Sequence, residues 1–500
     1  MRAKGVIVVG AATFAAWAMR WLPEPYRYWG MWGITGIVLS LVTREILVRQ
    51  SRDVVLRLWG FEWTRDEACC HFLITGATGT GKTSRAVVPI VAGLRETLPT
   101  TGIVAIDSKG ALWEPLSAMA TAMGQEESLR LIRVRPAEVP VATWTPPLRL
   151  NLLVDANVPW GTYAKLLVDT ATAAGQRGGQ TFFKESARDA ITHAMYALEA
   201  ADLPVTISNV HDMICVTRDL EMVRGRLEMV RTPAAERERQ YFSDFLAQPP
   251  EQRSGTVYTV ANFLRPYTPP DIAEVFCSTE PNFSLAEVDQ GRIVCLSVPQ
   301  TYQTERKYLN LLTKQLFFLH AFRRFDLPAE ERQRRNMIVL VLDEGQKTTL
   351  VSEDGFSDHG AVDELREAGV CLIAATQTPL SFHASFETEK KADVFMANLR
   401  TQIHFRAADE KGAKILSSKL GGRERRRTSG GFSGGRENRN WQVVERPHYL
   451  SEQLLALNTG WAVVQHPRRT TRPLCIRLPH TPHTAPQAAE PPHGKGASRR

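Results

Sequence analysis

Short runs of apolar residues recur along the chain and alternate with longer stretches in which apolar residues have helical spacing. The runs lie at residues 72–75, 102–106, 291–298, 337–342 and 370–377. They are continuous rather than alternating, which is typical of strands that helices cover on both faces of a parallel sheet. The pattern therefore predicts the α/β fold class.

Residues 181–264 have a different pattern, with helix-like blocks such as 183–198 and 219–231 and few β-branched runs. Because a strand pattern returns at residues 291–298, we interpret the block as an all-α domain inserted into the α/β domain. We expect the first part of the α/β domain at residues 51–175, the inserted domain at 176–283 and the second part at 284–465.

The first fifty residues contain two apolar stretches, 5–19 and 28–42, without a charged residue inside either. With their apolar flanks, both reach the roughly 20 residues that a membrane-spanning helix needs. Trp and Tyr gather between them and Arg or Lys flanks their outer ends, which predicts a two-helix transmembrane hairpin at residues 1–50 with both ends in the cytoplasm. A removable signal peptide is the alternative, since Ala16 and Ala18 flank Trp17 as in a signal-peptidase site.

The composition is that of a globular protein with a mild basic excess. Its 61 Lys and Arg residues exceed its 53 Asp and Glu residues, for a net charge of +8. This balance favours anionic partners such as nucleic acid or the acidic inner membrane leaflet. The seven cysteines are scattered and odd in number, which indicates reduced thiols rather than a disulfide framework or a zinc site.

A glycine-rich turn, GATGTGKT, directly follows the apolar run at residues 72–75. This spacing is typical of a phosphate-binding loop, whose glycines let backbone N–H groups surround a polyphosphate. A glycine-rich turn without a ligand is the alternative, but it leaves Lys82 unexplained. We expect Lys82 to meet the β- and γ-phosphates of ATP and Thr83 to meet Mg²⁺. The residues expected to bind the nucleotide are Gly76, Ala77, Thr78, Gly79, Thr80, Gly81, Lys82 and Thr83.

Two adjacent acids, Asp343 and Glu344, end the apolar run at residues 337–342. Ligands of open α/β sheets sit at the carboxyl ends of strands, so this is the pattern of a Walker B element. Asp343 is expected to hold Mg²⁺ through water. Glu344 is expected to be the general base that polarises the attacking water, a role worth about 10²–10⁴ in rate. Two solvated acids at a strand end are the alternative.

Two other strands are followed by polar residues. Gln377 is our candidate for a sensor of the γ-phosphate, and the alternative is a core strand followed by a turn at Pro379. Asp107 and Lys109 either approach the nucleotide or a neighbouring subunit, or cap the next helix.

Two further segments are too polar to form a core. Residues 423–439 interleave Arg with Gly and Ser, which suits either a mobile pore loop that touches phosphates or a flexible surface insertion. Residues 466–500 are rich in Pro, His, Ala and Arg and predict a disordered basic tail.

Five elements together resemble the type IV secretion coupling proteins, the TraG/TraD/TrwB class. The resemblance covers roughly residues 54–465 and implies a RecA-like P-loop ATPase core with an inserted all-α domain. It also implies a homohexamer on the cytoplasmic side of the bacterial inner membrane. The elements are GATGTGKT, the strand ending in DSKG, MIVLVLDE, LREAG with the strand ending in TQ, and MANLRTQIHF.

By this resemblance, the protein is an ATPase of conjugation that delivers single-stranded DNA with its attached relaxase, or effector proteins, to the proteins of a secretion channel. Arg366 matches the arginine that this class offers to a neighbour's γ-phosphate, and such a finger can be worth about 10³–10⁵ in turnover. An ordinary salt-bridged helix arginine is the alternative. The catalytic set is then Lys82, Glu344, Gln377 and Arg366, and the metal ligands are Thr83 and Asp343.

The sequence departs from the family in two places. After Asp343 and Glu344 it continues with GQKT where the family usually has an aromatic residue and proline, and its carboxyl end is short and basic where many members have a long acidic one. Two other functions stay open. One is a double-stranded DNA translocase of the FtsK/HerA kind, and the other is a docking receptor that binds nucleotide without pumping.

Overall fold

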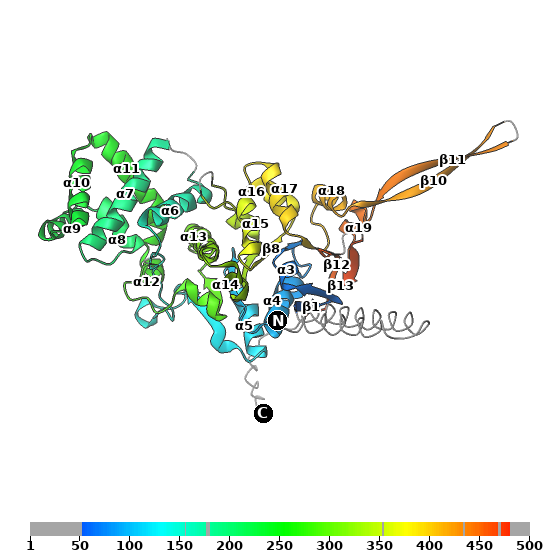
Figure 1. Ribbon diagram of the computed structural model, residues 1–500, viewed down its shortest axis with the longest axis horizontal. Coiled ribbons are helices and arrows are strands. Elements are labelled where there is room, and N and C mark those ends of the chain that lie inside the picture. Colours follow the sequence, from blue (N-terminus) through cyan, green and yellow to red (C-terminus); the bar gives the residue numbers. More distant parts are fainter. Residues whose placement is uncertain are drawn as a thin grey trace, which may run out of the picture. The chain divides into compact units, whose positions relative to one another are not determined.

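The computed structural model describes residues 53–155, 157–176, 181–352, 355–433, 436–468 and 472–480 (Figure 1). The chain divides into two units, residues 1–65 and 66–500. The transmembrane hairpin predicted at residues 1–50 lies outside the described residues. Within the described ranges, no helix combines the length and the apolar character that crossing a membrane requires.

The described part of the first unit is a β-hairpin. Strands β1 (Val54–Leu58) and β2 (Phe61–Thr64) pair in antiparallel orientation. Trp59 and Gly60 join them with positive φ angles of 55° and 79°, as the two-residue turns of tight hairpins require. Helix α3 (Arg65–Ala68) follows.

The second unit is built on a nine-stranded sheet with the order β13-β12-β9-β3-β8-β7-β4-β6-β5. The strands from β9 to β5 are parallel, whereas β12 and β13 are antiparallel to their neighbours. This arrangement confirms the α/β prediction and each of the five strands expected from the sequence. The strands are β3 (Phe72–Thr75), β4 (Gly102–Asp107), β5 (Leu129–Arg133), β6 (Ile293–Ser297), β7 (Ile338–Asp343), β8 (Val370–Thr376), β9 (Thr401–His404), β12 (Trp461–Gln465) and β13 (Leu474–Arg477).

The central strands are apolar throughout because both of their faces are buried. Every residue of β3, β4 and β8 is buried, as are the first five residues of β7. Helices lie along the chain between the strands and supply the covering layers. Those of the α/β part are α4 (Val88–Thr97), α5 (Trp113–Ala122), α13 (Gln303–Phe322), α14 (Ala329–Arg334), α15 (Asp358–Glu367), α16 (Pro379–Ser385), α17 (Glu389–Asn398), α18 (Glu410–Lys419) and α19 (Ser451–Leu455).

A run of seven helices separates β5 from β6 in the described chain and forms a helical group of its own (Figure 1). Helix α7 packs against α6, α8, α10 and α11. The helices predicted at residues 183–198 and 219–231 are confirmed as α7 and α9, while the domain boundaries themselves stay a prediction. The run comprises α6 (Trp160–Ala174), α7 (Thr181–Ala200), α8 (Ile207–Cys215), α9 (Thr217–Met229), α10 (Pro233–Ala247), α11 (Pro250–Leu264) and α12 (Pro270–Phe276).

The arginine-rich segment, for which the sequence left open a pore loop or a surface insertion, forms a β-hairpin. Strands β10 (Gly422–Ser433) and β11 (Arg436–Pro447) pair in antiparallel register along their whole length. The strand pairing was not predicted because a two-stranded ribbon is held by main-chain hydrogen bonds, which polar residues also make. Both interpretations of the role of this segment stay predictions.

The disordered tail predicted from residue 466 is also wrong for residues 474–477. These residues form β13, which pairs with β12 at the edge of the sheet. Leu474, Cys475 and Ile476 are an apolar run too short to stand out from the polar sequence around it. Residues 481–500 lie outside the described part.

Candidate nucleotide-binding and catalytic site

The phosphate-binding motif lies where the sequence predicts, between β3 and a helix. Residues 76–82 form the turn, and a single π-helical segment, Thr83–Val87, leads into α4. A Cβ on Gly76 would lie 2.6 Å from the Cβ of Phe405, at the end of the neighbouring strand β9, and Gly81 has a φ of 97°. Both positions therefore exclude other side chains, by close approach and by backbone conformation respectively.

Lys82 folds back over this turn. Its Nζ donates hydrogen bonds to the carbonyl oxygens of Gly76 at 2.6 Å and Ala77 at 3.2 Å. Burial lowers the pKa of Lys82, and the nearby carboxylate of Asp343 partly opposes this shift. A partly desolvated ammonium group in a loop of backbone donors suits an anion with several charges, such as a triphosphate.

The two motifs meet in space. Thr83 Oγ1 donates a hydrogen bond of 3.1 Å to Oδ2 of Asp343, although 260 residues separate the two in sequence. They meet because β8 alone separates β3 from β7 in the sheet, so that the parallel strands bring both motifs to the same edge.

Asp343 suits a cation. Burial raises the pKa of its carboxyl group, and the negative charges of Asp107 and Glu344 add to the rise. A buried carboxylate beside other acids is stabilised by a positive charge, and hydroxyl and carboxylate oxygens are ligands that Mg²⁺ prefers. The residues present therefore fit a Mg²⁺ ion held by Thr83 and Asp343.

Glu344 is held firmly by three neighbours. Its backbone has the left-handed conformation, with φ 55° and ψ 47°, which is uncommon for a residue other than glycine. One carboxylate oxygen lies 3.2 Å from Nζ of Lys109, and the other lies 2.7 Å from Nζ of Lys347 and accepts a hydrogen bond from Ser108. Burial raises the pKa of Glu344, but the bonds from Lys347, Ser108 and Lys109 outweigh it and lower the pKa to about 2.

The segment after β4 resolves the two interpretations of Asp107 and Lys109. The carboxylate of Asp107 accepts hydrogen bonds from the backbone N–H groups of Gly110, Ala111 and Leu112. Asp107 therefore caps the turn before α5, whereas Lys109 approaches the candidate catalytic acid.

Gln377 follows β8 at the same edge of the sheet. Thr376 pairs with Thr75 in the parallel strands β8 and β3. Gln377 and Gly76, the first residue of the phosphate-binding loop, therefore follow at the same end of neighbouring strands. This position suits a γ-phosphate sensor, and the role itself stays a prediction.

Arg366 is not brought to the nucleotide site of its own protomer. It lies exposed near the end of α15, before β8 begins, whereas Gln377 follows the end of that strand. The seven residues of β8 span about 20 Å at 3.3 Å per residue. Arg366 is thus at the opposite edge of the sheet from Thr83 and Asp343.

Sequence reasoning missed His71, which lies at that opposite edge. Its Nε2 donates to the carbonyl oxygen of Val362 in α15 at 2.8 Å, and its Nδ1 accepts from the backbone N–H of Leu372 in β8 at 3.0 Å. Burial, with the charges of Arg366 and Arg400 adding to it, lowers its pKa to about 4. The only signal in the sequence is a lone histidine directly before the first strand of the motif.

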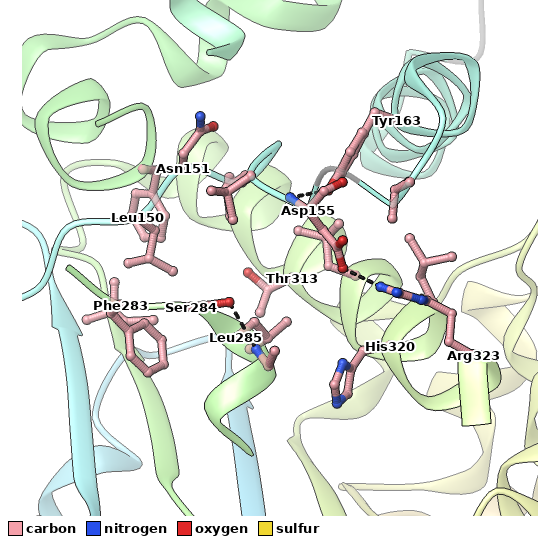
Figure 2. Close-up of a pocket in the computed structure, with 18 residues that line it drawn as sticks. Leu150, Asn151, Asp155, Tyr163, Phe283, Ser284, Leu285, Thr313, His320 and Arg323 are labelled. Atoms are coloured by element: carbon pink, nitrogen blue, oxygen red, sulfur yellow. Dashed lines mark hydrogen bonds and ion pairs between the residues drawn. The ribbon is translucent and has the colours of Figure 1, made fainter. Parts of the chain in front are cut away.

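A separate cavity of about 70 Å³ in the second unit is mostly apolar and differs from the candidate nucleotide site (Figure 2). Leu150, Phe283 and Leu285 are among the residues that line it. Asp155 and Arg323 point toward one another there and form an ion pair. Because Arg323 is paired with the carboxylate of Asp155 and most of the described lining is apolar, the cavity does not resemble a polyphosphate site.

The comparisons with known proteins agree with the fold. Residues 337–458, which begin at β7, match the family model described as the TraM recognition site of TraD and TraG. The structure of the bacterial conjugative coupling protein TrwBdeltaN70 in its unbound form has a TM-score of 0.60 to this chain, at 17% identity, over 86% of this chain and 88% of that one. The chain resembles the type IV coupling proteins in sequence motifs and in fold.

A second structure, the plasmid coupling protein TrwB in complex with ADP and Mg²⁺, has a TM-score of 0.58 at 15% identity and covers 86% of this chain and 90% of that one. A third, TrwB with a non-hydrolysable ATP analogue, has a TM-score of 0.59 at 16% identity, with 85% and 89% covered. No curated protein matches the chain in a sequence search. The RecA-like α/β core implied by the sequence resemblance is therefore confirmed at the level of the fold.

Proposed function

We propose that this protein is the ATP-driven motor of a type IV secretion or conjugation system. It recruits single-stranded DNA with its attached relaxase, or effector proteins, and moves this cargo to the secretion channel. In this proposal it is a homohexamer at the bacterial inner membrane, anchored by residues 1–50, with its ATPase domain in the cytoplasm.

One observation carries the proposal, the 3.1 Å hydrogen bond between Thr83 and Asp343. It joins a phosphate-binding loop to the acid of a strand two positions away in the sheet, which is the arrangement of a nucleotide hydrolase. TrwB has been crystallised with ADP and Mg²⁺, which supports the same two ligands for the present chain.

Each residue has one part in hydrolysis. The loop from Gly76 to Thr83 binds the phosphates, and Lys82 neutralises charge on the β- and γ-phosphates as the terminal phosphate leaves. Mg²⁺ held by Thr83 and Asp343 would supply further neutralisation of that charge. Glu344 orients the attacking water.

The remaining two residues act at the γ-phosphate. Gln377 detects whether this phosphate is present. Arg366, at the far edge of the sheet, serves the γ-phosphate of the next protomer in the ring. Hydrolysis then depends on assembly of the hexamer.

The description of the matched family model supports a role alongside TraD and TraG, because it names a recognition site for TraM in those proteins. The mild positive net charge of the chain also favours DNA as a partner.

The substitution Lys82→Ala tests the proposal. It removes the charge that meets the phosphates, so we expect loss of ATP hydrolysis and of conjugative DNA transfer while the protein still reaches the membrane fraction. Transfer at the normal frequency would contradict the proposal.

The other two functions make different predictions for the purified wild-type ring. A translocase of double-stranded DNA would be stimulated more by duplex than by single strands. A docking receptor would bind relaxase or effector protein without hydrolysing ATP in the presence of any DNA.

A further inference from the structure

A polar pocket of about 390 Å³ lies beside the groups that hold Glu344. Two partners of that carboxylate, Ser108 and Lys347, are among its lining residues, and the start of α13 contributes Arg306, Lys307 and Asn310. Of the described residues that line it, none belongs to the phosphate-binding loop. The pocket is therefore separate from the proposed triphosphate site, although both share Glu344 as a neighbour.

The pocket has cationic side chains in its wall and beside it, and the lysines among them are exposed to solvent. The side chains of Lys109 and Lys347 are 65% and 57% exposed, whereas that of Glu344 is only 9% exposed. The cations that line the pocket are Lys347, Lys307 and Arg306, of which Arg306 is buried. Lys109 does not line it but directly follows the lining residue Ser108. A ligand that enters from solvent meets the exposed lysines first, and a chain of phosphates fits such a surface.

The walls of the pocket are fixed. Asn310 Nδ2 donates to the carbonyl oxygen of Asp107 at 2.8 Å, which ties α13 to the end of β4. The fully buried Lys314 bonds to the carbonyl oxygen of Thr348 and, at 2.8 Å, to the carboxylate of Asp358. The backbone next to Lys347 is therefore anchored, and the long exposed lysine side chains are the parts with freedom to change partner.

We propose that this pocket binds the sugar-phosphate backbone of single-stranded nucleic acid and that a backbone phosphate draws Lys109 and Lys347 away from Glu344. This inference rests on the proposed function, since releasing Glu344 matters only if that residue orients the attacking water. Each lysine exchanges one anion for another, and Glu344 gains a free oxygen for the water.

The consequence is a link between cargo and turnover. Without a strand in the pocket, both oxygens of Glu344 are engaged by lysines and hydrolysis is slow. With a strand bound, the acid is free and ATP is consumed only while there is cargo to move.

The test compares Lys109→Gln, Lys347→Gln and the double variant with the wild type, in full-length protein. The ATPase rate is measured with and without a single-stranded oligonucleotide, and binding of that oligonucleotide is measured over a range of salt. Lys414→Gln is the matched control, because Lys414 is also 65% exposed and forms a similar ion pair with Glu410 on α18.

We expect the rate without DNA to rise at least about two- to fivefold for each lysine removed, since that is the factor for a fully exposed pair and the Glu344 end of each pair is buried. Stimulation by DNA should disappear in the double variant. The slope of log affinity against log salt should fall by about 0.7 for each lysine that contacts a phosphate. Lys414→Gln should leave all three quantities unchanged.

Failure of this inference and failure of the proposed function would give different results. If the wild type is stimulated by single strands and the double variant is stimulated equally, the inference is wrong and the proposed function stands. If the wild type hydrolyses no ATP under any condition, the proposed function itself fails. Stimulation by polyglutamate but not by the oligonucleotide would overturn the assignment of nucleic acid as the ligand.

Discussion

The carboxyl ends and the amino ends of the parallel strands carry different kinds of residue. They are called here the carboxyl edge and the amino edge of the sheet. At the carboxyl edge, Thr83 donates a hydrogen bond to Asp343. Glu344 forms ion pairs with Lys109 and Lys347. At the amino ends of the strands, His71 bonds to backbone groups of α15 and β8. Arg366 lies exposed on α15, one helical turn after Val362, the residue to which His71 donates. The groups at the carboxyl ends are those of the proposed hydrolytic site, whereas the exposed cation Arg366 lies away from them at the amino ends.

This difference fits the proposed hexamer, in which a site would be completed only in the assembled ring. In the proposed site, a triphosphate meets the loop, Asp343 for the metal and Glu344 for the water, but Arg366 is about a strand length away. In the proposed hexamer the amino edge of one protomer supplies it to the carboxyl edge of the next.

The largest expected effect is that of Arg366→Ala. We expect the ATPase rate of the assembled protein to fall by about 10³–10⁵, with nucleotide affinity nearly unchanged, because the arginine acts on the transition state. Steady-state kinetics and nucleotide titration measure the two quantities. Arg334 is a matched control, since it is an exposed arginine in the last turn of the helix that precedes β7.

A mixing experiment tests whether Arg366 and the phosphate-binding loop of one active site come from different protomers. We expect Arg366→Ala and Lys82→Ala protomers to be inactive alone, whereas a mixed ring would contain interfaces with an intact loop on one side and an intact arginine on the other. Recovery of activity on mixing supports the arrangement. A mixture as inactive as its components would show that both residues serve the same protomer.

The next effect concerns Glu344 at the carboxyl edge. Glu344→Gln should lower turnover by about 10²–10⁴, the usual range for loss of a general base, while ATP and Mg²⁺ still bind. Single-turnover kinetics and nucleotide titration test this. Wild-type turnover in the variant would exclude Glu344 from the chemistry.

A smaller effect concerns stability and pH at the amino edge. The native pKa of His71 is about 4, below its value of about 6.5 in the unfolded chain. The unfolded state then binds more protons between these values, so the free energy of unfolding falls as the pH drops from about 6.5 to 4. We expect His71 alone to account for a loss of about 2 kcal/mol between pH 7 and pH 5.

Urea unfolding at the two pH values measures this loss. His71→Asn tolerates the positive φ of 66° at this position and does not titrate, so its stability should fall less. His404 is the matched case at the carboxyl edge, since its pKa is lowered to about 3 by burial and it bonds to Thr75. Equal pH dependence of wild type and His71→Asn would contradict this role of His71.

The chemical motifs were predictable from the sequence because they are local. The glycine spacing before Lys82 and the apolar run before Asp343 each occupy fewer than about ten residues, and parallel strands place such ends at one edge. The five central strands were predictable for the same reason, as continuous apolar runs.

What the sequence did not reveal depends on side chains that meet only after folding. Lys109 and Lys347 follow two different strands, and their shared partner Glu344 becomes visible only once β4 and β7 are paired. His71 acts through backbone groups of α15 and β8, which no residue type signals. The hairpin β10–β11 was missed because its main-chain pairing leaves no apolar pattern.

The central claim is that Thr83 and Asp343 bind one metal ion at one triphosphate. The most direct measurement is anomalous diffraction from crystals grown with Mn²⁺ and a non-hydrolysable ATP analogue. We predict a single metal peak about 2 Å from Thr83 Oγ1, next to the γ-phosphate and in contact with Asp343 directly or through one water. A metal and nucleotide bound elsewhere, with Thr83 and Asp343 far apart, would contradict the account.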